Sequence, residues 1–167
     1  MSLQEQLLTT KLYIPPTRSN TISRLHLLNR LDTLVRRELT LVSSPAGFGK
    51  TTLLSTWCAT AASKGWSIAW ISLDTDDNDP IRFWSYLIVA LKKIVADLDV
   101  SVLSILRSPQ PPSIESILVT LINLLAVIPN EIALILDDYH LVEAPSIHNA
   151  IMYLIDHLPD LQVHLEH

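Results

Sequence analysis

Apolar residues along this chain occur in two patterns that alternate with each other. Short continuous apolar runs indicate strands, and between them apolar residues recur every three or four positions, as on one face of a helix. Strands alternating with helices predict an α/β fold with a parallel sheet and right-handed crossover connections. We expect strands at 40–44, 67–73, 132–136 and 161–165, and helices at 23–35, 50–64, 80–95, 113–128 and 145–157.

Local signals mark several of the expected helix ends. Gly65 follows the helix that begins at Lys50 and closes it, because glycine readily adopts the left-handed conformation found there. Asp79 caps the helix that begins at Pro80, and Ser113 caps the following helix. The run at 132–136 is continuously apolar, which indicates a strand buried on both faces of the sheet.

A glycine-containing loop with one lysine follows the first apolar run, at Pro45–Thr52. Gly47 and Gly49 allow the backbone to curl so that successive N–H groups point at phosphate oxygens. Lys50 brings a positive charge to the β- and γ-phosphates, the Thr51 hydroxyl is a ligand for Mg²⁺, and the helix N-terminus favours the same anion. The candidate nucleotide-binding residues are Ala46, Gly47, Phe48, Gly49, Lys50, Thr51 and Thr52.

One position departs from the usual phosphate-loop pattern, which begins with a glycine where this chain has Ser44. If Ser44 ends the strand with a negative φ, no glycine is needed there. The alternative is a chance Gly-Lys-Thr sequence in an ordinary loop. The strand before it and the helix after it disfavour that alternative.

A second chemical element, Asp137-Asp138, ends the apolar run 132–136. A carboxylate at the end of such a strand serves the Mg²⁺ shell in phosphate-loop nucleotidases. We assign Asp137 to Mg²⁺, through water, and Asp138 to orienting or activating the attacking water, with Lys50 as the second candidate catalytic residue. Alone, the two acids could simply begin a turn. Together with the phosphate loop, they predict a site for ATP or ADP with Mg²⁺.

The acidic segment Asp74–Asp79 follows the strand expected at 67–73. It does not fit a calcium loop, since the sixth position would be Asp79 instead of glycine and the twelfth Ser85 instead of glutamate. A helix cap is the favoured interpretation. Asp74 could still lie close to the nucleotide, because its strand ends at the same edge of the sheet.

Three basic residues near the N-terminus, Lys11, Arg18 and Arg24, leave two interpretations open. They either form a solvated face or contact the base or phosphates of a nucleotide. The histidines have no metal-ligand spacing, and His140 is expected at the surface or in a polar network. The four tryptophans are expected in the core and at its margins.

Composition excludes several classes of protein. The chain has 167 residues, 49% hydrophobic and 17% charged, which disfavours disorder. A net charge of −5 and the lack of a long basic cluster make duplex nucleic acid an unexpected partner for this segment. A single cysteine, Cys58, forms no intrachain disulfide and suits a reducing compartment. No signal peptide or long apolar span is visible, so we expect a cytoplasmic protein that does not enter a membrane.

Four motifs in fixed order resemble a known family. They are Thr10-Lys11-Leu12-Tyr13-Ile14-Pro15-Pro16, Ser43–Leu54, Leu73–Leu87 with its Arg82-Phe83-Trp84-Ser85-Tyr86-Leu87 ending, and Leu136-Asp137-Asp138-Tyr139-His140-Leu141. This set is similar to the N-terminal nucleotide-binding domain of large LuxR-family regulators of the MalT-like type. Those regulators are signal-transduction ATPases of the STAND class. A serine at the position of Ser44 is usual in that group.

The resemblance implies a fold: a three-layer P-loop NTPase of the ASCE type, with a mostly parallel sheet. Its fourth strand, 161–165, would be inserted between the first and third. Residues 1–22 would form an extended arm, with Pro15 and Pro16 excluding a helix and the stretch from Lys11 to Arg18 near the adenine. Residues 23–165 would form the nucleotide-binding core, truncated before a fifth strand. Residues 1–3 resemble a vector start, and 166–167 resemble the beginning of a polyhistidine tag.

The resemblance also implies a switch function. Such proteins hold ADP at rest, exchange it for ATP when an inducer binds, self-associate, and bind promoter DNA through a distant C-terminal helix-turn-helix. Slow hydrolysis then resets them. By that likeness Gly49, Lys50, Thr51 and Thr52 contact phosphates and Mg²⁺, and we expect weak binding and little or no turnover from this segment. The alternatives are a phosphotransferase or other metabolic phosphate-loop enzyme, or an interaction domain with a vestigial loop.

Overall fold

A four-stranded parallel sheet forms the centre of the molecule. The computed structural model describes residues 7–17, 24–34, 39–42, 47–99, 101–158 and 161–166. The strand order is β1-β4-β3-β2, so the fourth strand lies between the first and third, as expected. This architecture is compatible with a P-loop-like fold. The strands are β1 (Leu39–Val42), β2 (Ser67–Ser72), β3 (Ile132–Asp137) and β4 (Leu161–Glu166).

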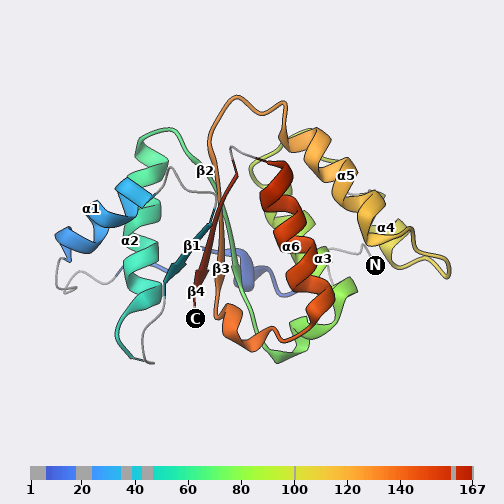
Figure 1. Ribbon diagram of the computed structural model, residues 1–167, viewed down its shortest axis with the longest axis horizontal. Coiled ribbons are helices and arrows are strands. Elements are labelled where there is room, and N and C mark those ends of the chain that lie inside the picture. The colour runs from blue at the N-terminus through green and yellow to red at the C-terminus, as the bar shows by residue number, and fades with distance from the viewer. Residues whose placement is uncertain are drawn as a thin grey trace.

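Helices cover both faces of this sheet. Figure 1 shows α1 and α2 on one side and α3, α5 and α6 on the other, giving three layers. The helices are α1 (Leu25–Leu34), α2 (Lys50–Ser63), α3 (Pro80–Lys92), α4 (Ser101–Leu106), α5 (Ile114–Leu125) and α6 (Pro145–His157). Three short 3₁₀ turns complete the described elements: η2 (Thr9–Leu12), η3 (Thr75–Asn78) and η4 (Tyr139–Leu141).

The predicted cap residues lie where their chemistry requires. Gly65 has φ 92° just after α2, in the left-handed region. The Asp79 side chain accepts a hydrogen bond from the Ile81 amide at 2.9 Å, and Ser113 accepts one from the Ser116 amide at 3.3 Å. These three predictions are confirmed, while Ser23, the predicted cap of the first helix, lies outside the described residues.

Two elements differ from the sequence-based expectation. The arm is not extended throughout, because Thr9–Leu12 forms the turn η2 and places Leu7 and Leu12 in the core. From Tyr13 to Thr17, where the prolines lie, no helix forms. Helix α4 was not predicted, since six residues are too few to establish a helical period.

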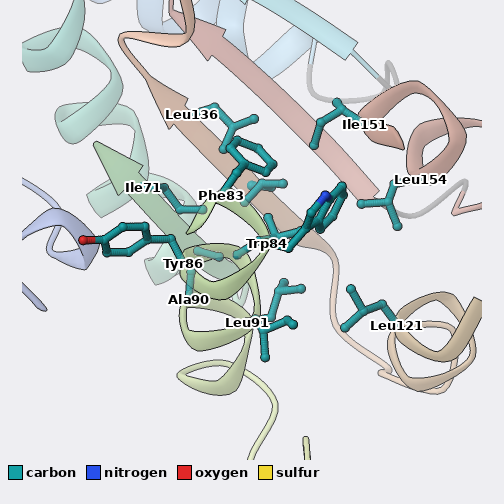
Figure 2. Close-up of a cluster of buried hydrophobic side chains, with 14 of the residues drawn as sticks. Ile71, Phe83, Trp84, Tyr86, Ala90, Leu91, Leu121, Leu136, Ile151 and Leu154 are labelled. Atoms are coloured by element: carbon teal, nitrogen blue, oxygen red, sulfur yellow. The ribbon is translucent and has the colours of Figure 1, made fainter. Parts of the chain in front are cut away.

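The core consists of two clusters of buried side chains, one on each face of the sheet. Along β3, Ile132, Leu134 and Leu136 join the larger cluster, and Ala133 and Ile135 join the smaller one. Every residue of β3 is buried, which confirms the expectation for this continuous apolar run. In Figure 2, side chains of α3 fill the larger cluster between the sheet and helices α5 and α6.

Aromatic and sulfur side chains lie in this core as expected. Trp57, Trp70 and Trp84 are buried, and Trp66 packs edge-on against Trp57 with ring centroids 5.9 Å apart. Burial of Cys58 raises the pKa of its thiol to about 12, so this residue is a structural thiol and not a reactive one. None of the helices in the described part of the chain is long and apolar enough to cross a bilayer.

Candidate functional site

The two chemical elements meet at the edge of the sheet where the parallel strands end. Gly47 and Gly49 have φ of 85° and 75°, so both occupy the left-handed region that favours glycine. An added Cβ at Gly47 would meet nothing within 4 Å, so backbone conformation and not space requires glycine there. Helix α2 begins immediately afterwards at Lys50. Ala46 and Ser44 lie outside the described residues, so the expectations for them stay predictions.

The two predicted metal ligands are in direct contact. The Thr51 hydroxyl donates to the Asp137 carboxylate, with Oγ1 3.1 Å from Oδ1 and 3.4 Å from Oδ2. Thr51 lies in the first turn of α2, and Asp137 is the last residue of β3, so the sheet brings together residues far apart in sequence. Asp137 is buried, with only 4% of its surface exposed.

The neighbouring acid, Asp138, has an unusual conformation and a perturbed charge. Its φ of 59° makes it the one non-glycine residue with positive φ among those the structure describes. Burial and the adjacent Asp137 raise the pKa of its carboxyl, while the charges of His140 and Lys50 oppose that shift. Lys50, predicted as a phosphate ligand, is therefore close enough to act electrostatically on the predicted water-activating residue. His140 itself is exposed, as expected.

Of the three basic residues left open by the sequence, Arg24 reaches the glycine loop. Its Nη1 donates to the carbonyl oxygen of Phe48 at 2.7 Å, while the Phe48 side chain is 57% exposed. Arg24 is exposed, which agrees with the solvated-face interpretation, and it also contacts the backbone of the loop, which neither interpretation anticipated. Arg18 lies outside the described residues.

Lys11, by contrast, is not solvated. It is buried and forms ion pairs with Asp74, at 2.9 Å, and with Asp77, whose side chain is fully buried. Arg82 completes the group, with Nε 3.1 Å from the Asp77 carboxylate. The expectation of a solvated face is therefore wrong for Lys11, and proximity to a nucleotide base stays untested.

The acidic segment after β2 is a structural turn, as the favoured interpretation predicted. Asp74 and Asp77 form a capping box around η3. Burial alone would raise the pKa of Asp74, but the hydrogen bond and charge of Lys11, aided by Arg82, hold that pKa below its usual range. Within the described ranges, no group of three or more histidine, cysteine or acidic side chains could hold a metal ion.

Sequence reasoning missed one polar residue beside the site, Asn78. It ends η3 and bonds to the loop that follows Asp138. Its position at the end of an acidic turn carried no signal of these contacts, because they join segments more than sixty residues apart.

Comparison with known proteins identifies relatives over almost the whole chain. It is 38% identical over 154 residues to the HTH-type transcriptional regulator MalT of Cronobacter sakazakii. It is 36% and 34% identical, over the same length, to the proteins of that name from Klebsiella pneumoniae and Yersinia enterocolitica. The chain matches a fragment of a MalT-like regulator. No protein-family model matches it.

These alignments cover most of this chain but only a small part of each relative. Each spans 92% of this chain but 17% of the relative. The chain therefore spans about a sixth of the length of the curated relatives it matches. The resemblance inferred from the four motifs is confirmed for this segment, while the activities named for the relatives describe much longer proteins.

Proposed function

We propose that this chain is the nucleotide-binding switch module of a transcription regulator and that it binds ATP or ADP with Mg²⁺. The observation that carries the proposal is the contact between Thr51 and Asp137 directly behind the glycine loop. A hydroxyl at the start of a helix and a carboxylate at the end of a buried strand are two oxygen donors of the kind Mg²⁺ prefers.

The chain's own residues supply the remaining chemistry. The left-handed Gly47 and Gly49 and the start of α2 favour an anion in front of the loop, and Lys50 adds a positive charge. Thr51 and Asp137 would hold Mg²⁺, which neutralises phosphate charge when bound. The raised pKa of Asp138 favours its role in accepting a proton from an attacking water.

In the whole protein we propose that nucleotide state controls self-association and that promoter DNA is bound by a part outside this chain. The relatives' name, HTH-type transcriptional regulator, supports this proposal over a metabolic phosphotransferase. Hydrolysis would be slow in the full-length regulator and negligible in this segment. A switch must hold its nucleotide longer than an ordinary enzyme does.

Titration calorimetry with ADP and ATP, each with Mg²⁺ and with EDTA, tests the proposal. Lys50→Ala should abolish binding in both conditions, because the phosphate charge loses its main counter-charge. Asp137→Asn should weaken binding only when Mg²⁺ is present. Lys64→Ala is the matched control: this exposed lysine follows the same helix and pairs with Asp32, so its loss should leave binding unchanged.

Two results would contradict the proposal. One is an absence of binding heat from the wild-type chain with either nucleotide. The other is a Lys50→Ala variant that binds as tightly as the Lys64→Ala control. Rapid ATP turnover by the wild-type chain, lost in Lys50→Ala, would show that this segment acts as an enzyme and not as a switch.

A further inference from the structure

Asp138 has a backbone conformation that its surroundings must maintain. Its φ and ψ of 59° and 33° lie in the left-handed region, which residues with a Cβ adopt at an energetic cost. Such a conformation persists only where neighbouring contacts over-determine it. The turn η4 begins at the next residue, and the Leu141 amide donates to the Asp138 carbonyl at 3.0 Å. Whatever fixes the end of η4 therefore also fixes Asp138.

The side-chain amide of Asn78 holds the end of that turn. Its Nδ2 donates to the Leu141 carbonyl at 2.8 Å. Its Oδ1 accepts from the backbone amides of Glu143, at 2.6 Å, and Ala144, at 3.0 Å. Since one end of the amide faces carbonyl oxygen and the other faces N–H groups, the partners define its orientation.

This arrangement uses the full hydrogen-bonding capacity of asparagine. The second Nδ2 proton goes to the Thr75 carbonyl at 3.0 Å, so two donors and two acceptor positions are all occupied. An aspartate side chain would lack the two donors, and an alanine side chain would lack the donors and the acceptor oxygen. The contact with the 141–144 backbone therefore needs both the donor and the acceptor of an asparagine amide.

The turn that carries Asn78 is itself held by hydrogen bonds and ion pairs. Asn78 is the last residue of η3, whose capping box joins Asp74 and Asp77, and Lys11 and Arg82 pair with those carboxylates. Just before that turn, the Leu73 amide donates to the Asp137 carbonyl at 3.0 Å. The turn after β2 is thus bonded both to the last residue of β3 and to the loop that follows Asp138.

We propose that Asn78 is a positioning residue for the Asp137-Asp138 pair, acting through the backbone of the loop 139–144. It does not contact the nucleotide. It keeps Asp138 in the left-handed conformation and so fixes the direction in which the two neighbouring carboxylates leave the strand. The inference rests on the proposed function, because the carboxylates need positioning only if they serve a Mg²⁺–nucleotide complex.

Two measurements on Asn78→Ala test this inference. Amide hydrogen exchange of Glu143 and Ala144 should accelerate by about tenfold or more, as expected for the loss of a hydrogen bond. Calorimetry with ADP should show an unchanged affinity in EDTA. The additional affinity given by Mg²⁺ should fall by about tenfold, the lower range for loss of a group that orients metal ligands.

Two further variants separate positioning from general stability. Asn78→Asp retains the acceptor for Glu143 and Ala144 but loses both donors, so its Mg²⁺-dependent affinity should lie between wild type and Asn78→Ala. Ser113→Ala removes the cap of α5 and lowers stability without removing a bond to the loop, so it should leave the Mg²⁺ effect unchanged and should not accelerate the Glu143 and Ala144 amides more than other amides of the protein.

The possible results separate the positioning role of Asn78 from the nucleotide binding on which it rests. If the wild-type chain binds no nucleotide, the proposed function and the inference fall together. If it binds with a Mg²⁺ effect that Asn78→Ala retains in full, only the positioning role is overturned. Unchanged exchange of the Glu143 and Ala144 amides in Asn78→Ala would also overturn it, because the loop would then be held by other contacts.

Discussion

Asp77 is a fully buried carboxylate with a cation on either side, Lys11 from the arm and Arg82 from α3. Burying the charges of Lys11 and Asp77 costs a large desolvation energy, which their attraction, aided by the partly exposed Arg82, offsets only while the partners are present. The ring of Tyr86 lies 4.5 Å from the Lys11 ammonium and adds a cation–π contact, and its hydroxyl accepts from the Leu8 amide at 3.2 Å. Such a group favours this docking position of the arm, because moving Lys11 away would leave the buried Asp77 paired with Arg82 alone.

Replacing a buried lysine and replacing an exposed lysine with alanine should change the free energy of unfolding by very different amounts. Lys11→Ala should lower the free energy of unfolding by about 3 kcal/mol, because it leaves the buried Asp77 with Arg82 alone. Lys64→Ala, which breaks an ion pair with side chains 52% and 35% exposed, should cost less than about 1 kcal/mol. Urea unfolding followed by tryptophan fluorescence measures both. Equal effects would show that the Lys11 cluster contributes no more than a surface pair.

Among the secondary-structure elements, those with a chemical signal at their ends were predicted most accurately. Pro145 and Pro80 begin α6 and α3, and the apolar run before Asp137 forms β3. The contact between Thr51 and Asp137 was also foreseeable, because parallel strands end at one edge. The contacts of Arg24 and Asn78 were not. Each bonds to a distant backbone carbonyl, and backbone groups carry no sequence signal of their partners.

The end of α2 offers a prediction at this scale. The Gly65 amide donates to the Ala62 carbonyl and the Trp66 amide to the Ala61 carbonyl, the bonding pattern of a Schellman cap. With φ at 92° and no atom within 4 Å of an added Cβ, only backbone strain opposes substitution. Gly65→Ala should therefore destabilise the fold by about 1 kcal/mol. Gly65→Asn should cost less, because asparagine tolerates the left-handed region better.

Urea midpoints of the two variants check this prediction. Both variants should retain the slope of the wild-type transition, since neither changes the surface buried on folding. An alanine variant as stable as wild type would mean that the chain leaves α2 in another way when glycine is absent.

At the scale of the whole molecule, the sheet joins the two cores into one unit. Neighbouring residues of β3 point alternately into the larger and the smaller cluster, so neither core can be lost while this strand stays packed on both faces. The arm strengthens the same unit, because η2 contacts β2 and Lys93 donates to the Leu12 carbonyl at 2.9 Å. We therefore expect the described elements to unfold together.

Cys58 provides a test of that cooperativity, because it is the one cysteine in the sequence and is fully buried in the smaller cluster. A thiol with a pKa of about 12 forms little thiolate, so Ellman's reagent should modify it only in molecules that have opened. The labelling rate should rise with urea with the slope of global unfolding. Under the proposed function, nucleotide at one hundred times its dissociation constant should slow labelling by about a hundredfold.

A variant with the thiol moved by one position provides the control for this labelling. Ala59 is exposed on the same helix, so a Cys58→Ala, Ala59→Cys double variant should react rapidly and independently of urea. Rapid labelling of the wild-type protein without urea would show that α2 separates from the sheet on its own. The smaller core would then open independently of the larger one, and the glycine loop would be attached to a mobile helix instead of to a single cooperative structure.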